Sequence, residues 1–270
     1  MKLIYQWVPW AYSNIACFKA NELIEEDITD MIWLPDFKSV WEQIDDNHIA
    51  ILPVENSYAW NIHENLYNFL RYDFKIIWDI NLEIDHCLLS KEQEIKDIKK
   101  VYSHPQALDQ CHDYLKKYWI KPIVFWDTAW AAEMITKKDE KWIWAIASDL
   151  AWDIYWLNIL DEKIQDQDWN TTKFFVIVPK NSKIELKEKK WKTSIIFETK
   201  NIPAALYKCL WAFATNNVNL TKIESMPSLK WPFTYFFWMN FEWNLNDENV
   251  IKSMDELKFF TKQIKILWEY

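Results

Sequence analysis

The chain has 270 residues, half of them hydrophobic, and a formal net charge of −9. This length allows one large domain or two modest ones, and the acidic balance argues against a nucleic-acid-binding protein, which needs a basic face. The sequence has no run of 18 apolar residues and no signal-peptide pattern at its start, so we expect a cytoplasmic protein without a membrane span.

Short apolar runs alternate with helical patterns over the first two thirds of the chain. The expected strands cover residues 2–6, 49–53, 101–103, 123–125, 143–147 and 172–178. The expected helices, each with a plausible start signal, cover residues 13–25, 105–118 and 128–137. This alternation predicts an α/β fold with mainly parallel strands.

The composition changes after residue 178. Residues 179–190 are charged, contain few apolar side chains, and are expected to form a linker. A βαββαβ pattern follows, with strands at 193–199, 219–225, 233–242 and 264–267 and helices at 203–216 and 247–261. Pro203 suits the first turn of its helix. The pattern is typical of a ferredoxin-like unit.

The chain contains 20 tryptophans and no glycine, although average usage would give roughly 19 glycines. Trp119 stands just after a helical pattern and Trp231 stands in a predicted turn, both positions that favour glycine. We therefore hypothesise that Trp41 and Trp238 are genuine and that the other 18 (20 minus 2) are UGA glycine codons read with the wrong table. A true Trp-rich binder of carbohydrate or of a membrane interface is disfavoured, because it too would need glycine in its turns.

Polar side chains gather where predicted strands end, which is where α/β proteins bind ligands. Glu55, Asn56 and Ser57 follow one strand, while Ser103 and Thr128 stand where two helices begin. For Ser103 and Thr128 taken singly, helix capping is the simpler explanation. The five histidines and four cysteines show no metal-binding spacing, and the cysteines fit reduced, buried thiols. Taken together, the clusters indicate a cleft for a small carboxylate ligand.

Several blocks, in order, resemble those of the prephenate dehydratases that carry a C-terminal ACT regulatory domain. They are WVPWAYS at 7–13, PVENS at 53–57 followed by Trp60, SHPQALDQC at 103–111, TAWAA at 128–132, NTTKF at 170–174, NIPAAL at 201–206 and NLTKIESMP at 219–227. The resemblance implies a two-lobed catalytic domain like periplasmic binding proteins over 1–178, with its second lobe at about 85–158. It also implies a linker over 179–190 and a ferredoxin-like ACT domain over 191–270.

The resemblance implies conversion of prephenate to phenylpyruvate, with loss of carbon dioxide and water and without a cofactor or metal. Thr172 is the expected essential residue, since its hydroxyl could hydrogen-bond the departing oxygen. The other expected catalytic residues are Glu55, Asn56, Ser103 and Gln110, and the expected substrate-binding residues are Ser13, Ser57, Thr128, Ala129, Lys173 and Phe174. Lys173 replaces the family's arginine, which keeps the charge and loses the bidentate contact.

The ACT-like segment implies feedback control by L-phenylalanine, bound between subunits of a homodimer or homotetramer. The positions that correspond to the effector site are Asn201, Ala204, Ala205, Leu206, Glu224 and Ser225. Ala204 replaces a glycine of the regulatory loop and Met226 replaces an arginine, so both could weaken the effector's affinity.

Three alternatives stay open. The chain could act on arogenate, it could be a non-catalytic amino-acid sensor, or it could be a fragment of a fused chorismate mutase–dehydratase. The intact block at 170–174 disfavours the sensor, and the absence of a helical extension before Met1 favours a monofunctional chain. If Trp7, Trp10, Trp60 and Trp130 are read literally, their indoles are expected to crowd the substrate cleft.

Overall fold

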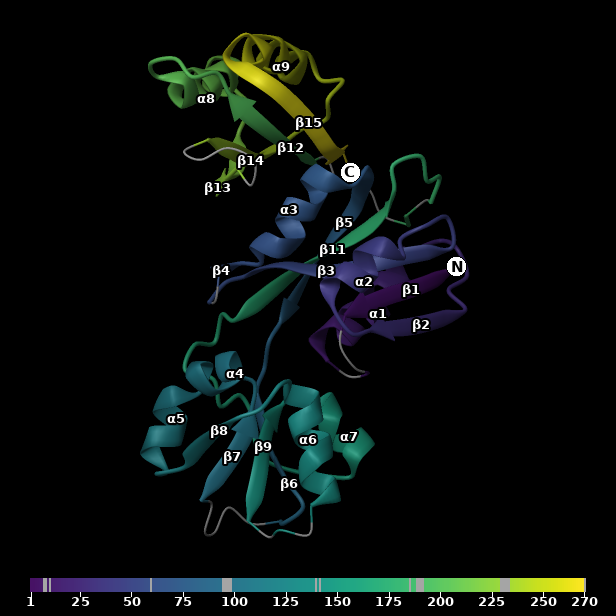
Figure 1. Ribbon diagram of the computed structural model, residues 1–270, viewed down its shortest axis with the longest axis vertical. Coiled ribbons are helices and arrows are strands. Elements are labelled where there is room, and N and C mark those ends of the chain that lie inside the picture. The colour runs from purple at the N-terminus through teal and green to yellow at the C-terminus, as the bar shows by residue number, and fades with distance from the viewer. Residues whose placement is uncertain are drawn as a thin grey trace. The chain divides into compact units, whose positions relative to one another are not determined.

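The computed structural model describes residues 1–6, 9, 11–58, 60–93, 99–138, 140, 142–184, 186–187, 192–228 and 234–269. The chain, whose elements are labelled in Figure 1, divides into two compact units. The first unit comprises Met1–Leu66 and Asp79–Val176, and the second comprises Tyr67–Trp78 and Ile177–Tyr270. Trp7, Trp10, Trp231 and part of the predicted linker lie outside the described residues.

The first sheet has the strand order β2-β1-β3-β11-β5, with β4 paired to β3. Its strands are β1 (Lys2–Gln6), β2 (Asp30–Leu34), β3 (His48–Asn56), β4 (Trp60–Asn61), β5 (Phe74–Glu83) and β11 (Thr171–Pro179). The helices that accompany it are α1 (Tyr12–Leu23), α2 (Phe37–Glu42) and α3 (His63–Arg71). Strand β1 pairs in parallel with β2 and β3, and its consecutive residues Leu3, Ile4 and Tyr5 are all buried, as in a parallel strand covered on both faces.

The second sheet of the first unit has the order β10-β6-β9-β7-β8. Its strands are β6 (Cys87–Ser90), β7 (Lys100–Ser103), β8 (Lys121–Val124), β9 (Ile143–Ala147) and β10 (Asn158–Asp161). Helices α4 (Pro105–Gln110) and α5 (His112–Lys117) flank it on one side and α6 (Thr128–Lys137) and α7 (Leu150–Tyr155) on the other, as Figure 1 shows. Alternate residues of β9 supply the two cores, with Ala145 facing α6 and Trp144 facing α4 and α5.

The C-terminal part of the second unit is an antiparallel sheet of order β13-β14-β12-β15. Its elements are β12 (Lys192–Thr199), α8 (Ala205–Thr215), β13 (Leu220–Pro227), β14 (Tyr235–Glu242), α9 (Glu248–Phe260) and β15 (Thr261–Glu269). Ile195 and Phe197 of β12 and Met239 and Phe241 of β14 form a core with the two helices. The predicted α/β fold class, with its C-terminal ferredoxin-like βαββαβ unit, is thus confirmed.

Most predicted elements are present, and those at 2–6, 128–137 and 143–147 have the predicted bounds. The single helix expected over 105–118 is wrong, because Cys111, with φ −112° and ψ 21°, separates α4 from α5. The position expected for Pro203 is also wrong, since α8 begins at Ala205. None of the described helices is long and apolar enough to cross a membrane.

The expected helix caps are each displaced by one residue. His104 caps α4, because Pro105 favours an extended residue before it, and the His104 side chain accepts from the Gln106 amide. Asp127 caps α6, and its carboxylate accepts from the Trp130 amide at 3.0 Å. The capping roles expected for Ser103 and Thr128 are therefore wrong.

Three helices end in the same glycine-type motif, and two of them have a tryptophan at its left-handed position. These residues are Trp119 at φ 56°, Trp156 at φ 53° and Asn217 at φ 56°. In each case the next amide donates to a carbonyl five residues earlier, which is the long bond of the Schellman motif: Ile120 to Leu115, Leu157 to Trp152 and Val218 to Phe213. The helix-end position predicted for Trp119 is confirmed.

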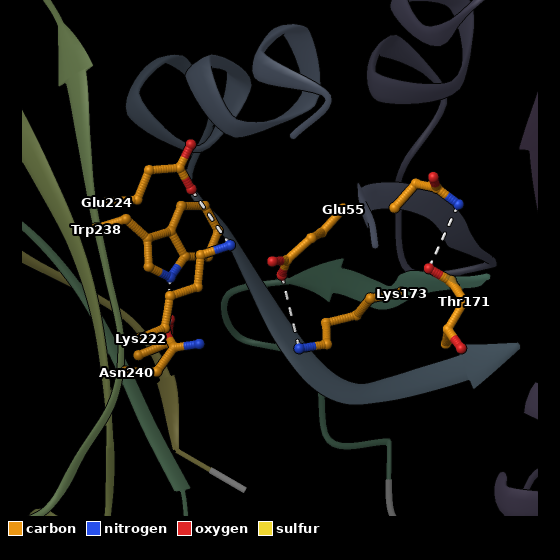
Figure 2. A network of polar contacts seen from close by, with 9 residues as sticks. Glu55, Thr171, Lys173, Lys222, Glu224, Trp238 and Asn240 are labelled. Atoms are coloured by element: carbon orange, nitrogen blue, oxygen red, sulfur yellow. Dashed lines mark hydrogen bonds and ion pairs between the residues drawn. The ribbon is translucent and has the colours of Figure 1, made fainter. Parts of the chain in front are cut away.

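The tryptophans differ sharply in their surroundings. Trp41 and Trp238 are buried, and their indole nitrogens donate to Asn65 Oδ1 at 2.9 Å and Asn240 Oδ1 at 2.7 Å (Figure 2 shows the second pair). In contrast, Trp119 is 91% exposed and Trp156 is 88% exposed. Of these four, Trp41 and Trp238 have the burial and the hydrogen-bond acceptor that an indole normally finds in a core.

Candidate active site

The first unit contains a cavity of about 160 Å³ that is lined by strands of its first sheet and by helices and connecting segments next to its second sheet. The lining residues come from α1, β3, α4, β11 and the start of α6, together with the segment before β6 and the residues just before α3 and α4. They are Tyr12, Ser13, Pro53, Asn56, Ile62, Ile84, His86, His104, Gln106, Ala107, Gln110, Asp127, Thr128, Thr172 and Phe174.

The alternation of strand β11 decides which side chains of the NTTKF block reach this cavity. Successive side chains of a strand point to opposite faces, and Thr172 and Phe174 line the cavity. Lys173 faces the other way and forms an ion pair with Glu55, at 3.7 Å between Nζ and Oε2 (Figure 2). The hydroxyl of Thr172 is thus the polar side-chain group that this strand presents to the cavity.

Asn56 fixes how the Thr172 hydroxyl is oriented. The Asn56 amide nitrogen donates to Thr172 Oγ1 at 2.9 Å, while its oxygen accepts from the Tyr58 backbone amide at 3.0 Å. Because a backbone N–H can only donate, the Asn56 amide cannot be flipped. Thr172 therefore accepts from Asn56, and its own hydroxyl hydrogen is available to a molecule in the cavity.

Asn56 also begins a longer line of buried hydrogen bonds. Its nitrogen donates to Asn170 Oδ1 at 2.9 Å, and Asn170 Nδ2 donates to Gln110 Oε1 at 3.1 Å. The same Gln110 oxygen lies 2.7 Å from His86 Nε2. The other ring nitrogen of His86 lies 3.3 Å from the Tyr12 hydroxyl, which also reaches the Asp85 carbonyl at 2.7 Å. Sequence analysis missed His86, Asn170 and Tyr12.

Three titratable groups at the cavity are shifted by their surroundings. Burial lowers the pKa of His86, against the opposing effects of its hydrogen bond to Gln110 and the charge of Asp85. Burial also lowers the pKa of His104, with Asp127 acting in the opposite direction. Burial raises the pKa of Asp127, although the amides at the start of α6 stabilise its charged form. Both histidines are therefore neutral near pH 7.

The structure brings six of the predicted catalytic and substrate-binding residues together around the cavity: Ser13, Asn56, Gln110, Thr128, Thr172 and Phe174. Five others are absent from its described lining: Glu55, Ser57, Ser103, Ala129 and Lys173. Ser103 donates to the Ile146 carbonyl at 2.6 Å, and Ser57 donates to the Trp169 carbonyl at 3.0 Å. Within the described part of the chain, no group of three or more His, Cys, Asp and Glu could hold a metal ion.

The predicted crowding of the cleft by indoles is wrong for Trp130. That side chain is partly exposed and lies outside the cavity's lining. Trp7 and Trp10 are outside the described residues, and so is the side chain of Trp60.

The predicted effector residues all belong to the second unit. Asn201 and Ala204 precede α8, Ala205 and Leu206 open it, and Glu224 and Ser225 lie on β13. Ala204 adopts a left-handed conformation at φ 57°, which glycine would adopt at a lower cost in free energy. Glu224 forms an ion pair with Lys222 at 3.2 Å (Figure 2).

A two-lobed protein with two α/β sheets, whose cavity presents hydroxyl and amide groups oriented by their hydrogen bonds, has a cavity that suits a small polar ligand. The chain belongs to the prephenate dehydratase family, since the family model described as Prephenate dehydratase matches residues 3–182. It is 35% identical over 271 residues to a prephenate dehydratase of Methanocaldococcus jannaschii, covering 99% of this chain and 97% of the relative. It is 35% identical over 285 residues to arogenate dehydratase/prephenate dehydratase 1 of Arabidopsis thaliana, covering 100% of this chain and 72% of the relative.

Solved structures share the fold over nearly the whole chain. GqqA, described as a novel type of quorum quenching acylase, is 29% identical with a TM-score of 0.84, covering 99% of this chain and 96% of GqqA. Prephenate dehydratase from Arthrobacter aurescens, solved in complex with L-Phe, is 22% identical with a TM-score of 0.84, covering 100% of this chain and 89% of that protein. The second likeness concerns the fold alone.

Proposed function

We propose that the chain is a cytoplasmic enzyme that converts prephenate to phenylpyruvate, a step of L-phenylalanine biosynthesis. The observation that carries this proposal is the Thr172 hydroxyl, which lines the cavity and accepts a hydrogen bond from Asn56. An oriented hydroxyl donor is what the departure of a ring hydroxyl requires from the protein.

The reaction breaks two bonds of prephenate. The carbon–carbon bond to the ring carboxylate breaks and releases carbon dioxide, and its electron pair moves through the ring and expels the hydroxyl oxygen from the opposite ring carbon. Loss of that oxygen makes the ring aromatic, and the oxygen, which leaves with the pair of the broken carbon–oxygen bond, takes one proton from solution and becomes water. Thr172 donates a hydrogen bond to this oxygen as its negative charge grows. A threonine hydroxyl is too weak an acid to transfer its proton fully.

The remaining lining residues are assigned to holding the substrate. The amides at the start of α1, near Ser13, suit a substrate carboxylate because helix N-termini attract anions and the N-cap residue Ala11 supplies no side-chain cap. At α6 the Asp127 carboxylate already accepts from the first amides, so Thr128 offers the substrate its hydroxyl. Gln110 offers a second amide donor, and Phe174 offers an apolar surface to the ring. Lys173 and Glu55 neutralise one another, so in this proposal they support β11 together with Ser57, and Ser103 and Ala129 support the neighbouring sheet.

An assay of the full chain with prephenate and with arogenate, following phenylpyruvate and phenylalanine separately, tests the function. We expect phenylpyruvate from prephenate. Preferred turnover of arogenate would favour the nearest alternative, which the name of the Arabidopsis relative keeps open. Tight binding of either compound without turnover would favour a non-catalytic sensor.

We further propose that residues 1–178 form the catalytic domain, with the second lobe at about 85–158, and that 191–270 form an ACT domain that binds L-phenylalanine. The ferredoxin-like order of β12 to β15 supports this assignment, and so does the L-Phe bound by the Arthrobacter protein. The family resemblance implies an effector bound between neighbouring ACT domains, so the proposal includes a homodimer or homotetramer.

Titration of the activity with L-phenylalanine is expected to show inhibition, because an effector that prefers one quaternary state shifts the equilibrium toward it. The variant Ala204→Gly is expected to respond at lower concentrations, since it removes the strain of a left-handed alanine at φ 57°. D-Phenylalanine is the control for unspecific inhibition. A flat response from both proteins would remove the regulatory assignment, whereas a response from Ala204→Gly alone would mean that Ala204 has disabled the switch.

We also propose that the natural protein carries glycine at the 18 positions other than Trp41 and Trp238. Four of the seven residues described with positive φ are tryptophans, namely Trp119, Trp142, Trp156 and Trp243. In addition, the buried indole nitrogen of Trp144 has no hydrogen-bond partner among the described residues. A positive φ and a buried N–H without a partner both cost free energy when the residue is tryptophan. Glycine adopts a positive φ readily and has no side-chain N–H.

A further inference from the structure

We propose that His86 is a positioning residue for the dehydration: its Nε2–H holds the Gln110 side-chain oxygen, so that the Gln110 amide nitrogen is presented to the substrate. This inference rests on the proposed function, because the substrate in question is prephenate. His86 lines the cavity, but it acts here through Gln110 and is not itself assigned to the reacting atoms.

The first step is that one backbone amide sets the polarity of the whole line. Tyr58 N–H donates to Asn56 Oδ1, so Asn56 must turn its nitrogen toward Asn170. Asn170 then has to accept with its oxygen, and its nitrogen is left to donate to Gln110. Any flipped amide along this line would bring two donors together.

The second step is that this polarity dictates the tautomer of His86. The side-chain oxygen of Gln110 faces both Asn170 and His86, and it lies 2.7 Å from His86 Nε2. Nε2 must therefore carry a hydrogen. Burial keeps the ring neutral, so Nδ1 carries no hydrogen. The Tyr12 hydroxyl lies 3.3 Å from Nδ1 but donates its one hydrogen to the Asp85 carbonyl at 2.7 Å, so the bond from Nε2 to Gln110 is the one that fixes the ring.

The third step concerns the side-chain amide nitrogen of Gln110. The Gln110 nitrogen is buried and has no hydrogen-bond partner among the described residues, although Gln110 lines the cavity. A buried donor without an acceptor is unfavourable unless something else supplies one. The oxygen of Gln110 is held from two sides, by Asn170 and His86, which prevents the amide from turning its nitrogen inward. The nitrogen is thus set aside for an acceptor on the ligand.

Two substitutions separate positioning from mere support of the fold. His86→Leu removes the donor and keeps the volume, whereas His86→Gln restores an amide nitrogen near the position of Nε2. We expect His86→Leu to lower kcat about 10- to 100-fold with little change in KM, since a loosely held group loses much of its contribution. His86→Gln should recover most of that loss. Tyr114→Phe, which removes a hydrogen bond to Asp161 outside the cavity, is the stability control.

The same substitutions in a Gln110→Ala protein give the sharpest test. If His86 acts through Gln110, His86→Leu should cost nothing further once Gln110 is gone. A full additional loss in that background, or equal losses for His86→Leu and His86→Gln, would overturn the proposal. If wild-type protein forms no phenylpyruvate, the proposed function fails and these kinetic comparisons do not apply.

If the protein forms no phenylpyruvate, NMR of the wild-type protein still tests the inference. With ¹⁵N-labelled histidine, NMR distinguishes a protonated ring nitrogen from a bare one. We expect the His86 resonances, assigned by their absence in His86→Gln, to show a neutral ring protonated at Nε2. A ring protonated at Nδ1 alone would overturn the proposal whatever the activity.

Discussion

Replacement of Thr172 by valine is expected to lower kcat about 100- to 1,000-fold, the cost of removing one preorganised donor to a developing oxyanion. Valine keeps the size and branching of threonine, so β11 should retain its conformation. Asn56 would lose the acceptor that it now contacts at 2.9 Å, and the departing oxygen of the substrate would lose its donor. Substrate binding should change less, because the hydroxyl contributes mainly in the transition state. Steady-state kinetics of phenylpyruvate formation measure both effects, and Thr172→Ala should be at least as impaired.

The neighbouring threonine is the matched control. Thr171 precedes Thr172 on the same strand, but its hydroxyl donates to the Trp169 carbonyl at 3.4 Å and it does not line the cavity. Thr171→Val should keep nearly full activity, and Thr172→Ser, which retains a hydroxyl, should keep a substantial part. Near-normal turnover by Thr172→Val would refute the assignment. Equal losses at positions 171 and 172 would indicate that β11 had been disturbed.

The sequence predicted best those elements whose patterns are local. Residues 128–137 have a clear helical period and an acidic residue in front, and 143–147 are an uninterrupted apolar run, so both were predicted with their observed bounds. Strand β5 and helix α3 were not predicted, because the turns around them lack the glycines that usually mark an element's ends. The break at Cys111 was missed because nothing in the local pattern of 105–118 interrupts the helical period.

The residues of the site also divide into those that the sequence could identify and those that it could not. Thr172, Asn56 and Gln110 stand in blocks that carry the family resemblance, so they could be selected from the sequence alone. The alternation that turns Lys173 away from Thr172 was also readable, since the strand itself was predicted. His86 was not readable, because its partners Gln110 and Tyr12 are 24 and 74 residues away in the sequence. A lone histidine before a short strand has no spacing signal, and only the folded chain reveals its contacts.

Substitution of tryptophan by glycine is expected to have opposite effects at different positions of this chain. Trp119→Gly and Trp156→Gly should each raise the free energy of unfolding by roughly 1–2 kcal/mol, because they relieve left-handed residues at φ 56° and 53°. Trp41→Gly and Trp238→Gly should each lower it by about 3–5 kcal/mol, because they leave cavities in buried cores. Thermal and denaturant unfolding of the four variants measure these changes. Uniform destabilisation would argue that the exposed tryptophans are native.

The same reasoning extends to all 18 positions. The four tryptophans with positive φ together cost roughly 4–8 kcal/mol, as much as the whole stability of many domains. The chain with glycine at these positions should therefore fold and turn over prephenate, while the chain with literal tryptophan should be far less stable. Peptide mass spectrometry of the natural protein decides the matter directly. The peptide across residues 127–133 should carry glycine at position 130, and the peptide containing Trp41 should carry tryptophan, which makes it the internal control. Tryptophan in both peptides would end the recoding hypothesis and leave the left-handed indoles as real strain in the native fold.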